Sequence, residues 1–212
     1  MLFETTKRAI DILGAIVLLV IFSPIILATA IAIKLTSAGP VLADTPKRVG
    51  KEGKLFYPYK FRSMIVNAHN LLRKDPRFKR LYKEYQKSSY KLRRDPRITK
   101  VGKIIRKHSI DEIPQLVNVL KGEMSIVGPR PYYPDELSQQ QKRYPHTRKL
   151  VKEVLSVRPG ITGFWQVSGR SEVNFDKRIE MDAYYARKKS IWLDILILLK
   201  TPWAMLTGKG AE

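Results

Sequence analysis

Cysteine is absent from this chain of 212 residues, and histidine occurs only three times. Without a thiol, the protein forms no disulfide, no thiolate zinc site, no iron–sulfur cluster and no cysteine nucleophile. The histidines, His69, His108 and His146, are far apart and include no H-x-x-x-H pair, so a histidine-rich metal site is not expected. Any bound metal is expected to be a hard cation with oxygen ligands.

Acidic residues are also scarce, with 19 Asp and Glu against 40 Lys and Arg and a formal net charge of +21. Such a surface favours polyanionic partners, which include nucleic acid, anionic lipid and phosphorylated substrates. The signatures G-x-G-x-x-G and G-x-x-x-x-G-K-S/T are both missing, so a nucleotide would have to bind to another scaffold. With 44% hydrophobic residues, the chain can form one folded domain, which excludes a disordered basic tail.

The longest apolar run covers residues 12–33 and carries no charged side chain. Its 22 residues are enough to cross a bilayer core. Ser23 and Pro24 interrupt the middle, where proline removes a backbone donor and bends a helix. Basic residues flank both ends, which favours a re-entrant kinked helix over residues 1–36 with both ends on the cytoplasmic side. The alternatives are a simple transmembrane span, a cleavable signal peptide and a buried core helix.

The remaining residues, 37–212, are interpreted as one cytoplasmic catalytic domain. Alternating aromatic and polar residues over 55–64 predict a short strand element. Residues 69–94 have a charged helical pattern, interrupted at Asp75-Pro76, that predicts a solvated or headgroup-facing surface. The segment of about residues 190–206 is predicted to form an interfacial amphipathic helix, because Trp192 and Trp203 favour the bilayer interface. A core helix is the alternative.

Asp111 and Glu112 are the candidate catalytic carboxylates. Ser109 with Glu112 fits the capping box S-x-x-E, which predicts both acids in the first turn of a helix that ends near Gly122. Acidic residues at a helix N-terminus are commonly structural, and spacing alone favours that role. Adjacent helical residues point about 100° apart, so the two carboxylates could serve neighbouring tasks, one as nucleophile and one as cation ligand.

Several basic residues lie in turns rich in glycine or proline, where a rigid backbone suits arginine to bidentate phosphate recognition. These candidates are Lys60, Arg62, Arg130, Arg158 and Arg170. Each is weak evidence alone, because a chain with 40 basic residues must place some of them near turns.

Longer motifs resemble the bacterial monotopic phosphoglycosyl transferases, also called bacterial sugar transferases. In chain order these motifs are Ser23-Pro24, Lys60 to Met64, His108 to Leu116, Asn118 to Pro131, Val157 to Gly163, Trp165 to Arg170 and Glu180 to Tyr185. The string from Pro131 to Leu137 further resembles the undecaprenyl-phosphate glucose or galactose phosphotransferases. Those enzymes often carry an additional N-terminal membrane region, so the chain is expected to correspond to the catalytic module alone.

The resemblance implies an α-rich α+β monotopic membrane enzyme on the cytoplasmic face of the bacterial inner membrane. The implied reaction passes a phospho-sugar from a UDP-sugar, UDP-glucose or UDP-galactose, to undecaprenyl phosphate and releases UMP. Asp111 would be the nucleophile and Glu112 a ligand of Mg²⁺. A helix N-terminus beneath Asp111 would lower its pKa. Anionic inner-membrane lipids are further expected partners, nucleic acid is not, and a homo-oligomer stays open.

The other implied site residues contact phosphate or nucleotide, or organise the polar site. They are Lys60, Arg62, Arg130, Arg158, Arg170 and Asp182. One departure is Pro46, which stands where the family often has glutamine and puts a contact by Arg48 in doubt. Two other functions remain open: a membrane-tethered basic protein that binds anionic lipid or nucleic acid without catalysis, and a phosphatase-like hydrolase that uses the same carboxylate.

Overall fold

The computed structural model describes residues 2–87, 92, 95–168 and 173–206. The predicted helix-rich fold with small strand elements is confirmed. The helices are α1 (Leu2–Thr36), α2 (Ala68–Lys74), α3 (Lys79–Lys87), α4 (Lys100–Lys107), α5 (Gln115–Lys121), α6 (Pro134–Arg143), α7 (Thr147–Val154), α8 (Phe164–Ser168), α9 (Phe175–Lys188) and α10 (Ile191–Leu206). Short 3₁₀ turns are η1 (Lys51–Gly53), η2 (Pro76–Phe78) and η3 (Ile110–Glu112).

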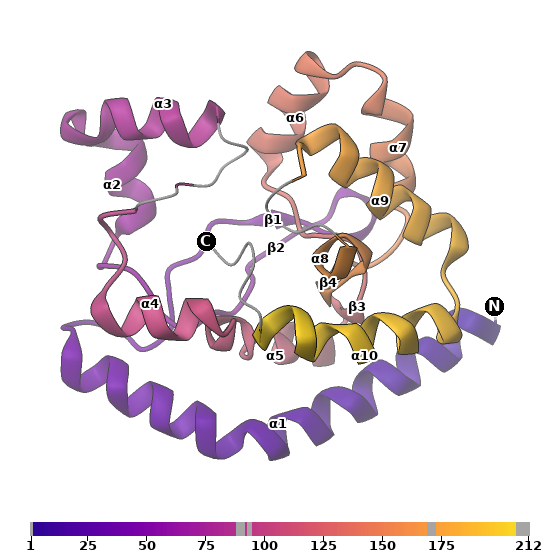
Figure 1. Ribbon diagram of the computed structural model, residues 1–212, viewed down its shortest axis with the longest axis horizontal. Coiled ribbons are helices and arrows are strands. Elements are labelled where there is room, and N and C mark those ends of the chain that lie inside the picture. The colour runs from indigo at the N-terminus through magenta and orange to yellow at the C-terminus, as the bar shows by residue number, and fades with distance from the viewer. Residues whose placement is uncertain (1, 88–91, 93–94, 169–172, 207–212) are drawn as a thin grey trace.

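The four strands among the described residues form two small sheets of two strands each. Strands β1 (Arg48–Val49) and β2 (Leu55–Phe56) pair antiparallel, with Arg48 opposite Phe56. Strands β3 (Ser125–Val127) and β4 (Gly160–Thr162) pair parallel, with Ser125 opposite Gly160. Within residues 55–64, the predicted strand is therefore limited to its first two positions. Figure 1 shows α1 along one edge of the molecule, with α4 and α10 beside it and α2, α3, α6 and α7 on the far side.

Helix α1 is one continuous helix of 35 residues that contains Pro24 and is bent along its length (Figure 1). Proline lacks the N–H that would bond the carbonyl of Val20 four residues earlier. The Ser23 hydroxyl donates to that carbonyl over 2.8 Å, which satisfies it locally. The helix is long and apolar enough to cross a membrane, so the re-entrant placement stays a prediction.

The N-terminal end of α1 is tied to the body by polar contacts. The Lys7 ammonium lies 2.6 Å from the Asp194 carboxylate of α10. Asp11 is 3% exposed and accepts hydrogen bonds from the Ile126 amide over 3.0 Å and the Ser125 hydroxyl over 2.8 Å. A buried carboxylate needs such partners, since an unpaired charge is costly. These contacts fix α1 against β3.

The C-terminal end of α1 also packs against the body. Ile33 is buried in one cluster with Phe61 and Ile105. Both ends of the helix therefore contact the same domain, while its middle exposes apolar side chains such as Val20 and Leu27.

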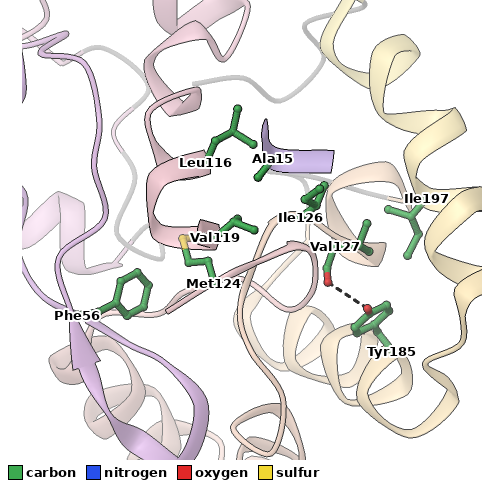
Figure 2. Close-up of a cluster of buried hydrophobic side chains, with 9 residues drawn as sticks. All are labelled: Ala15, Phe56, Leu116, Val119, Met124, Ile126, Val127, Tyr185 and Ile197. Carbon is green, nitrogen blue, oxygen red and sulfur yellow. Dashed lines mark hydrogen bonds between the residues drawn. The ribbon is translucent and has the colours of Figure 1, made fainter. Parts of the chain in front are cut away.

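The central core joins α1, α5, α9 and α10 around β3 (Figure 2). Its buried members are Ala15, Phe56, Leu116, Val119, Met124, Ile126, Val127, Tyr185 and Ile197. The Tyr185 hydroxyl donates to the Val127 carbonyl over 3.1 Å, the contact drawn in Figure 2. This core fixes β3 at the point where the chain leaves for the loop from Gly128 to Pro131.

Helix α4 packs its backbone directly on the segment that carries Lys60. Thr99 caps α4 by accepting from the Gly102 amide over 2.9 Å. A Cβ atom on Gly102 would lie 1.9 Å from the carbonyl oxygen of Ser63, so this crossing requires glycine.

We expect Gly102→Ala to lower the free energy of unfolding by about 1–3 kcal/mol, because the backbone must move apart to accept the methyl group. Helix propensity alone predicts the opposite sign, since alanine is the better helix former. Thermal unfolding in detergent measures the change. Gly14→Ala in α1 is the control, because its new Cβ would meet only the tip of the Ile126 side chain. A higher melting temperature for Gly102→Ala would contradict this prediction.

Candidate active site

Turn η3 presents the two candidate carboxylates, although the predicted capping box does not form. Ser109 takes a left-handed conformation, with φ 54°, and its side chain makes no cap hydrogen bond. Asp111 and Glu112 therefore lie in a 3₁₀ turn just before α5, and Glu112 is directed to another partner. The predicted end of the helix at Gly122 is confirmed, with φ 79° there.

A cavity of about 350 Å³ lies beside this turn. Asp111 and Glu112 line it, together with Lys60, Arg130 and Tyr133. These residues come from four separate parts of the chain: the segment after β2, turn η3, the loop after β3 and the start of α6. The structure thus brings the two candidate carboxylates together with Lys60 and Arg130 at one concave site.

Lys60 forms an ion pair with Glu112. A backbone hydrogen bond of 3.0 Å from the Phe61 amide to the Asp111 carbonyl holds the two segments together. Desolvation alone would raise the pKa of Glu112, but the charge and hydrogen bond of Lys60, together with the charges of Arg130 and Arg48, lower it below its ordinary value. Glu112 is therefore ionised at neutral pH.

Asp111 is 7% exposed, and burial raises its pKa to about 6, despite the opposing charge of Lys60. The expectation that a helix N-terminus lowers this pKa is wrong. Desolvation is the largest contribution, and the neighbouring Glu112 charge acts in the same direction. The carboxylate is nevertheless ionised in most molecules at neutral pH.

The loop after β3 positions Arg130. Gly128 and Gly160 cross so closely that a Cβ on Gly160 would lie 2.0 Å from the Gly128 nitrogen. The Arg130 guanidinium lies 5.5 Å from the ring centroid of Trp165, which also lines the cavity. The backbone amide of Arg130 donates to the Asp182 carboxylate over 3.2 Å, so a buried residue outside the described cavity lining fixes the loop.

Asp182 is fully buried and supports the site without lining the described cavity. One oxygen accepts from the Tyr132 hydroxyl over 2.8 Å and from the Arg130 amide. Burial raises the pKa of Asp182 to about 7. The expected role in polar organisation fits this position, whereas contact with a phosphate does not.

Arg62 and Arg158 both donate hydrogen bonds to backbone carbonyls of the protein. The Arg62 side chain is 5% exposed and donates to carbonyl oxygens of the segment that follows α1, although it borders the cavity. The Arg158 Nε donates to the Gly122 carbonyl over 3.0 Å, and the residue is not part of the described cavity lining. Arg170 lies outside the described residues.

Sequence reasoning gave no site role to His69 and Tyr133, which line this cavity, and it left a contact by Arg48, which also lines it, in doubt. The Arg48 guanidinium lies 3.3 Å from the centroid of the Tyr133 ring, and the His69 ring stacks on Tyr133 at 6.1 Å. The Tyr-Tyr pair after Pro131 was a visible signal, but its spacing indicated no role.

The described residues contain no group of three or more histidines and acidic residues arranged to hold a metal. Asp111 and Glu112 are two adjacent carboxylates at an open cavity. Mg²⁺ commonly binds through one or two carboxylates together with substrate phosphates and water. The donor set therefore fits Mg²⁺ held jointly with a phosphorylated substrate.

The described site combines two adjacent carboxylates with cations, on a helix-rich scaffold that includes a long apolar helix. The sequence profile of the family described as bacterial sugar transferase matches residues 2–208. The chain belongs to this family of phosphoglycosyl transferases.

Relatives extend this comparison. The chain is 44% identical over 209 residues to an undecaprenyl-phosphate galactose phosphotransferase of Salmonella typhimurium, covering 97% of this chain and 41% of the relative. It is 44% identical to an uncharacterized sugar transferase of Haemophilus influenzae, covering 97% and 42%. It is 37% identical to the exopolysaccharide production protein ExoY of Rhizobium meliloti, covering 97% and 87%. The chain thus spans about two fifths of the length of the first two relatives.

We expect Asp182 to make the folded protein less stable as pH rises from about 4 to 7. Its raised pKa means that the folded state keeps a proton that the unfolded chain loses, so the free energy of unfolding falls by at most about 1.4 kcal/mol per pH unit. Asp182→Asn should flatten this part of the profile. Denaturant unfolding of both proteins between pH 4.5 and 8 measures it, and an unchanged slope would count against the assignment.

Proposed function

We propose that this protein transfers a phospho-sugar from a UDP-sugar to undecaprenyl phosphate and releases UMP, as the first membrane step of a cell-surface polysaccharide pathway. The observation that carries the proposal is Asp111, a buried carboxylate at a cavity lined by Lys60 and Arg130. The relatives support it, because one is named as an undecaprenyl-phosphate galactose phosphotransferase and another as an undecaprenyl-phosphate glucose phosphotransferase. Glucose and galactose are both retained as the transferred sugar.

In the first step, a carboxylate oxygen of Asp111 forms a bond to the phosphorus that carries the sugar. The bond from this phosphorus to the UMP oxygen breaks, and UMP leaves with that electron pair. An anion that approaches a diphosphate is repelled, so cations must offset the charge that develops. Lys60 and Arg130 are placed to do this, since both line the cavity beside Asp111.

In the second step, an oxygen of undecaprenyl phosphate attacks the same phosphorus. The bond to Asp111 breaks, its carboxylate is regenerated, and the product is an undecaprenyl-diphosphate sugar. The acceptor phosphate is already ionised, so this step requires no general base. Lys60 and Arg130 therefore serve both phosphates in turn.

Glu112 is the residue we propose as a ligand of Mg²⁺. Its ionised carboxylate lines the cavity and is held by Lys60, so a phosphate-bound cation would share it with that ammonium group. Bound Mg²⁺ would supply Lewis-acid neutralisation of the phosphate charge.

We further propose that α1 lies within one leaflet of the inner membrane and that the remaining domain rests on the cytoplasmic face. Both ends of α1 contact the same domain through Asp11 and Ile33, whereas a straight span of 35 residues would extend about 50 Å in one direction. The exposed Trp192 and Trp203 of α10 suit the interface. Anionic headgroups would attract the basic surface.

Replacement of Asp111 by Asn should reduce UMP release by at least about 10³-fold, because the amide does not form the covalent intermediate. Purified protein in nanodiscs is assayed with UDP-glucose, UDP-galactose and their N-acetylated counterparts, with Mg²⁺ and undecaprenyl phosphate. EDTA should abolish release, and sustained turnover should require the lipid. Lys54→Ala is the control, since this lysine is 84% exposed and should keep wild-type activity.

The assay also separates the competing functions. Undiminished turnover without undecaprenyl phosphate would indicate a hydrolase. Absence of UMP release from folded wild-type protein with every donor would indicate a basic tether that does not catalyse.

The membrane placement is tested with single cysteines, which label selectively because the chain has none of its own. Thr6→Cys and Leu35→Cys occupy exposed positions near the two ends of α1, and Val20→Cys lies near its middle. A membrane-impermeant maleimide should label both end positions in inverted vesicles and neither in intact spheroplasts, while position 20 is protected. Labelling of the two ends from opposite sides would establish a simple span.

A further inference from the structure

One wall of the cavity is built from two rings and a guanidinium group. Arg48, His69 and Tyr133 all line the cavity, and we refer to these three side chains as the stacked wall. Arg48 lies 3.3 Å from the Tyr133 ring centroid, and its Nη1 donates to the Pro131 carbonyl over 3.2 Å. The His69 ring stacks on Tyr133 at 6.1 Å with an interplanar angle of 21°.

Hydrogen bonds from Arg97 hold the segment next to His69. Arg97 is 4% exposed and donates from Nη1 to the carbonyl of Ala68, the residue before His69, over 2.9 Å. Its Nε donates to Asp95 over 2.8 Å. His69, the second residue of α2, therefore follows a residue whose carbonyl is held in place, as a preorganised binding residue requires.

The stacked wall adjoins the groups that act on phosphate. Arg48 is close enough to Glu112 to lower the pKa of that carboxyl. The Lys60 and Arg130 charges similarly contribute to the lowered pKa of the Tyr133 phenol, in addition to Arg48 and a hydrogen bond with Tyr85. The wall is thus beside the site of phosphoryl transfer.

The direction of the displacement at phosphorus favours the sugar as the occupant of this part of the cavity. In an in-line displacement, the leaving group departs opposite the nucleophile, so UMP lies across the phosphorus from Asp111. The sugar oxygen is one of the groups around the phosphorus that remain in place. Residues next to the Asp111-Glu112 pair therefore border the sugar more closely than they border the departing UMP.

The chemistry of the wall also suits hydroxyl groups. Arg48 covers a face of the Tyr133 ring at 3.3 Å, which leaves no room there for a stacked nucleobase. Burial, with the charges of Arg73 and Arg48, lowers the pKa of His69 to about 4, so its imidazole is neutral at physiological pH. A neutral imidazole offers one donor and one acceptor, the combination that a hydroxyl group matches.

We propose that the stacked wall of Arg48, His69 and Tyr133 reads the hydroxyl groups of the donor hexose and determines which UDP-sugar the protein accepts. This inference rests on the proposed function and assigns a substrate contact to the segment around α2. A site that hydrogen-bonds a substrate hydroxyl discriminates strongly against an analogue that lacks or misplaces it.

Equilibrium binding to Asp111→Asn protein in nanodiscs tests this inference without turnover. Dissociation constants are measured for UDP-glucose, UDP-galactose, their two N-acetylated counterparts and UMP. Adding His69→Ala should reduce the preference between the better-bound hexose and its C4 epimer at least about tenfold, while UMP affinity changes less than twofold. Tyr133→Phe, which keeps the ring, should act in the same direction. His146→Ala, at an exposed histidine that is not part of the described cavity lining, is the matched control and should change neither.

Three other results would each overturn the inference. Parallel loss of affinity for UMP and for all donors would assign the wall to the nucleoside. Unchanged preference in both folded wall variants would leave it as scaffold, and equal binding of all donors by the parent protein would remove the selectivity to be explained. Selective binding that depends on His69, with no UMP release by wild-type protein, would refute the transferase but retain the wall.

Discussion

The hydrogen bonds that Asp11 accepts from Ser125 and Ile126 are the constraint on which the rest of the structure depends. They join the apolar helix to β3, and β3 leads directly into the loop that carries Arg130. The Asp11 carboxylate is 3% exposed, and its burial is tolerated only with these hydrogen-bond donors. The contact therefore fixes which residues of α1 lie opposite β3. The depth of α1 in any membrane and the height of the catalytic cavity above it are thereby linked.

The cavity balances charge by placing two carboxylates among fixed cations. Lys60 pairs with Glu112 and leaves Asp111 buried beside it, so the two neighbouring acids differ in the direction of their pKa shifts. Divergent environments are how adjacent carboxylates acquire different tasks. Glu112, ionised and more exposed, suits cation binding, whereas the desolvated Asp111 suits attack on a phosphorus that cations have made accessible.

Local features of the fold were predictable, because they depend on neighbours in sequence. Pro24 predicted the bend of α1, Asp75-Pro76 the break between α2 and α3, and Gly122 the end of α5. The capping box at Ser109 failed for a tertiary reason. The Glu112 side chain pairs with Lys60, 52 residues earlier, instead of with the backbone of the turn in which it lies.

The site residues show the same difference between what sequence neighbours determine and what tertiary contacts determine. Lys60, Arg130, Asp111 and Glu112 were identified through motif resemblance, and they line one cavity. The hydrogen bonds that Arg62 donates to the carbonyls after α1 could not be predicted from its motif neighbours, although the residue also borders the cavity. The contact between His69 and Tyr133 joins residues that are 64 positions apart, and no periodicity in the sequence predicts this stack.

In the reaction we propose, a covalent intermediate would explain why one set of cations is sufficient for two phosphorylated substrates. Direct transfer would require the diphosphate donor and the lipid phosphate to occupy the cavity together, with their negative charges opposed across a single phosphorus. Transfer through Asp111 separates the two encounters in time, so Lys60 and Arg130 neutralise one substrate after the other. In that reaction the donor would occupy the cavity first, beside the stacked wall, and the lipid phosphate would follow after UMP has left.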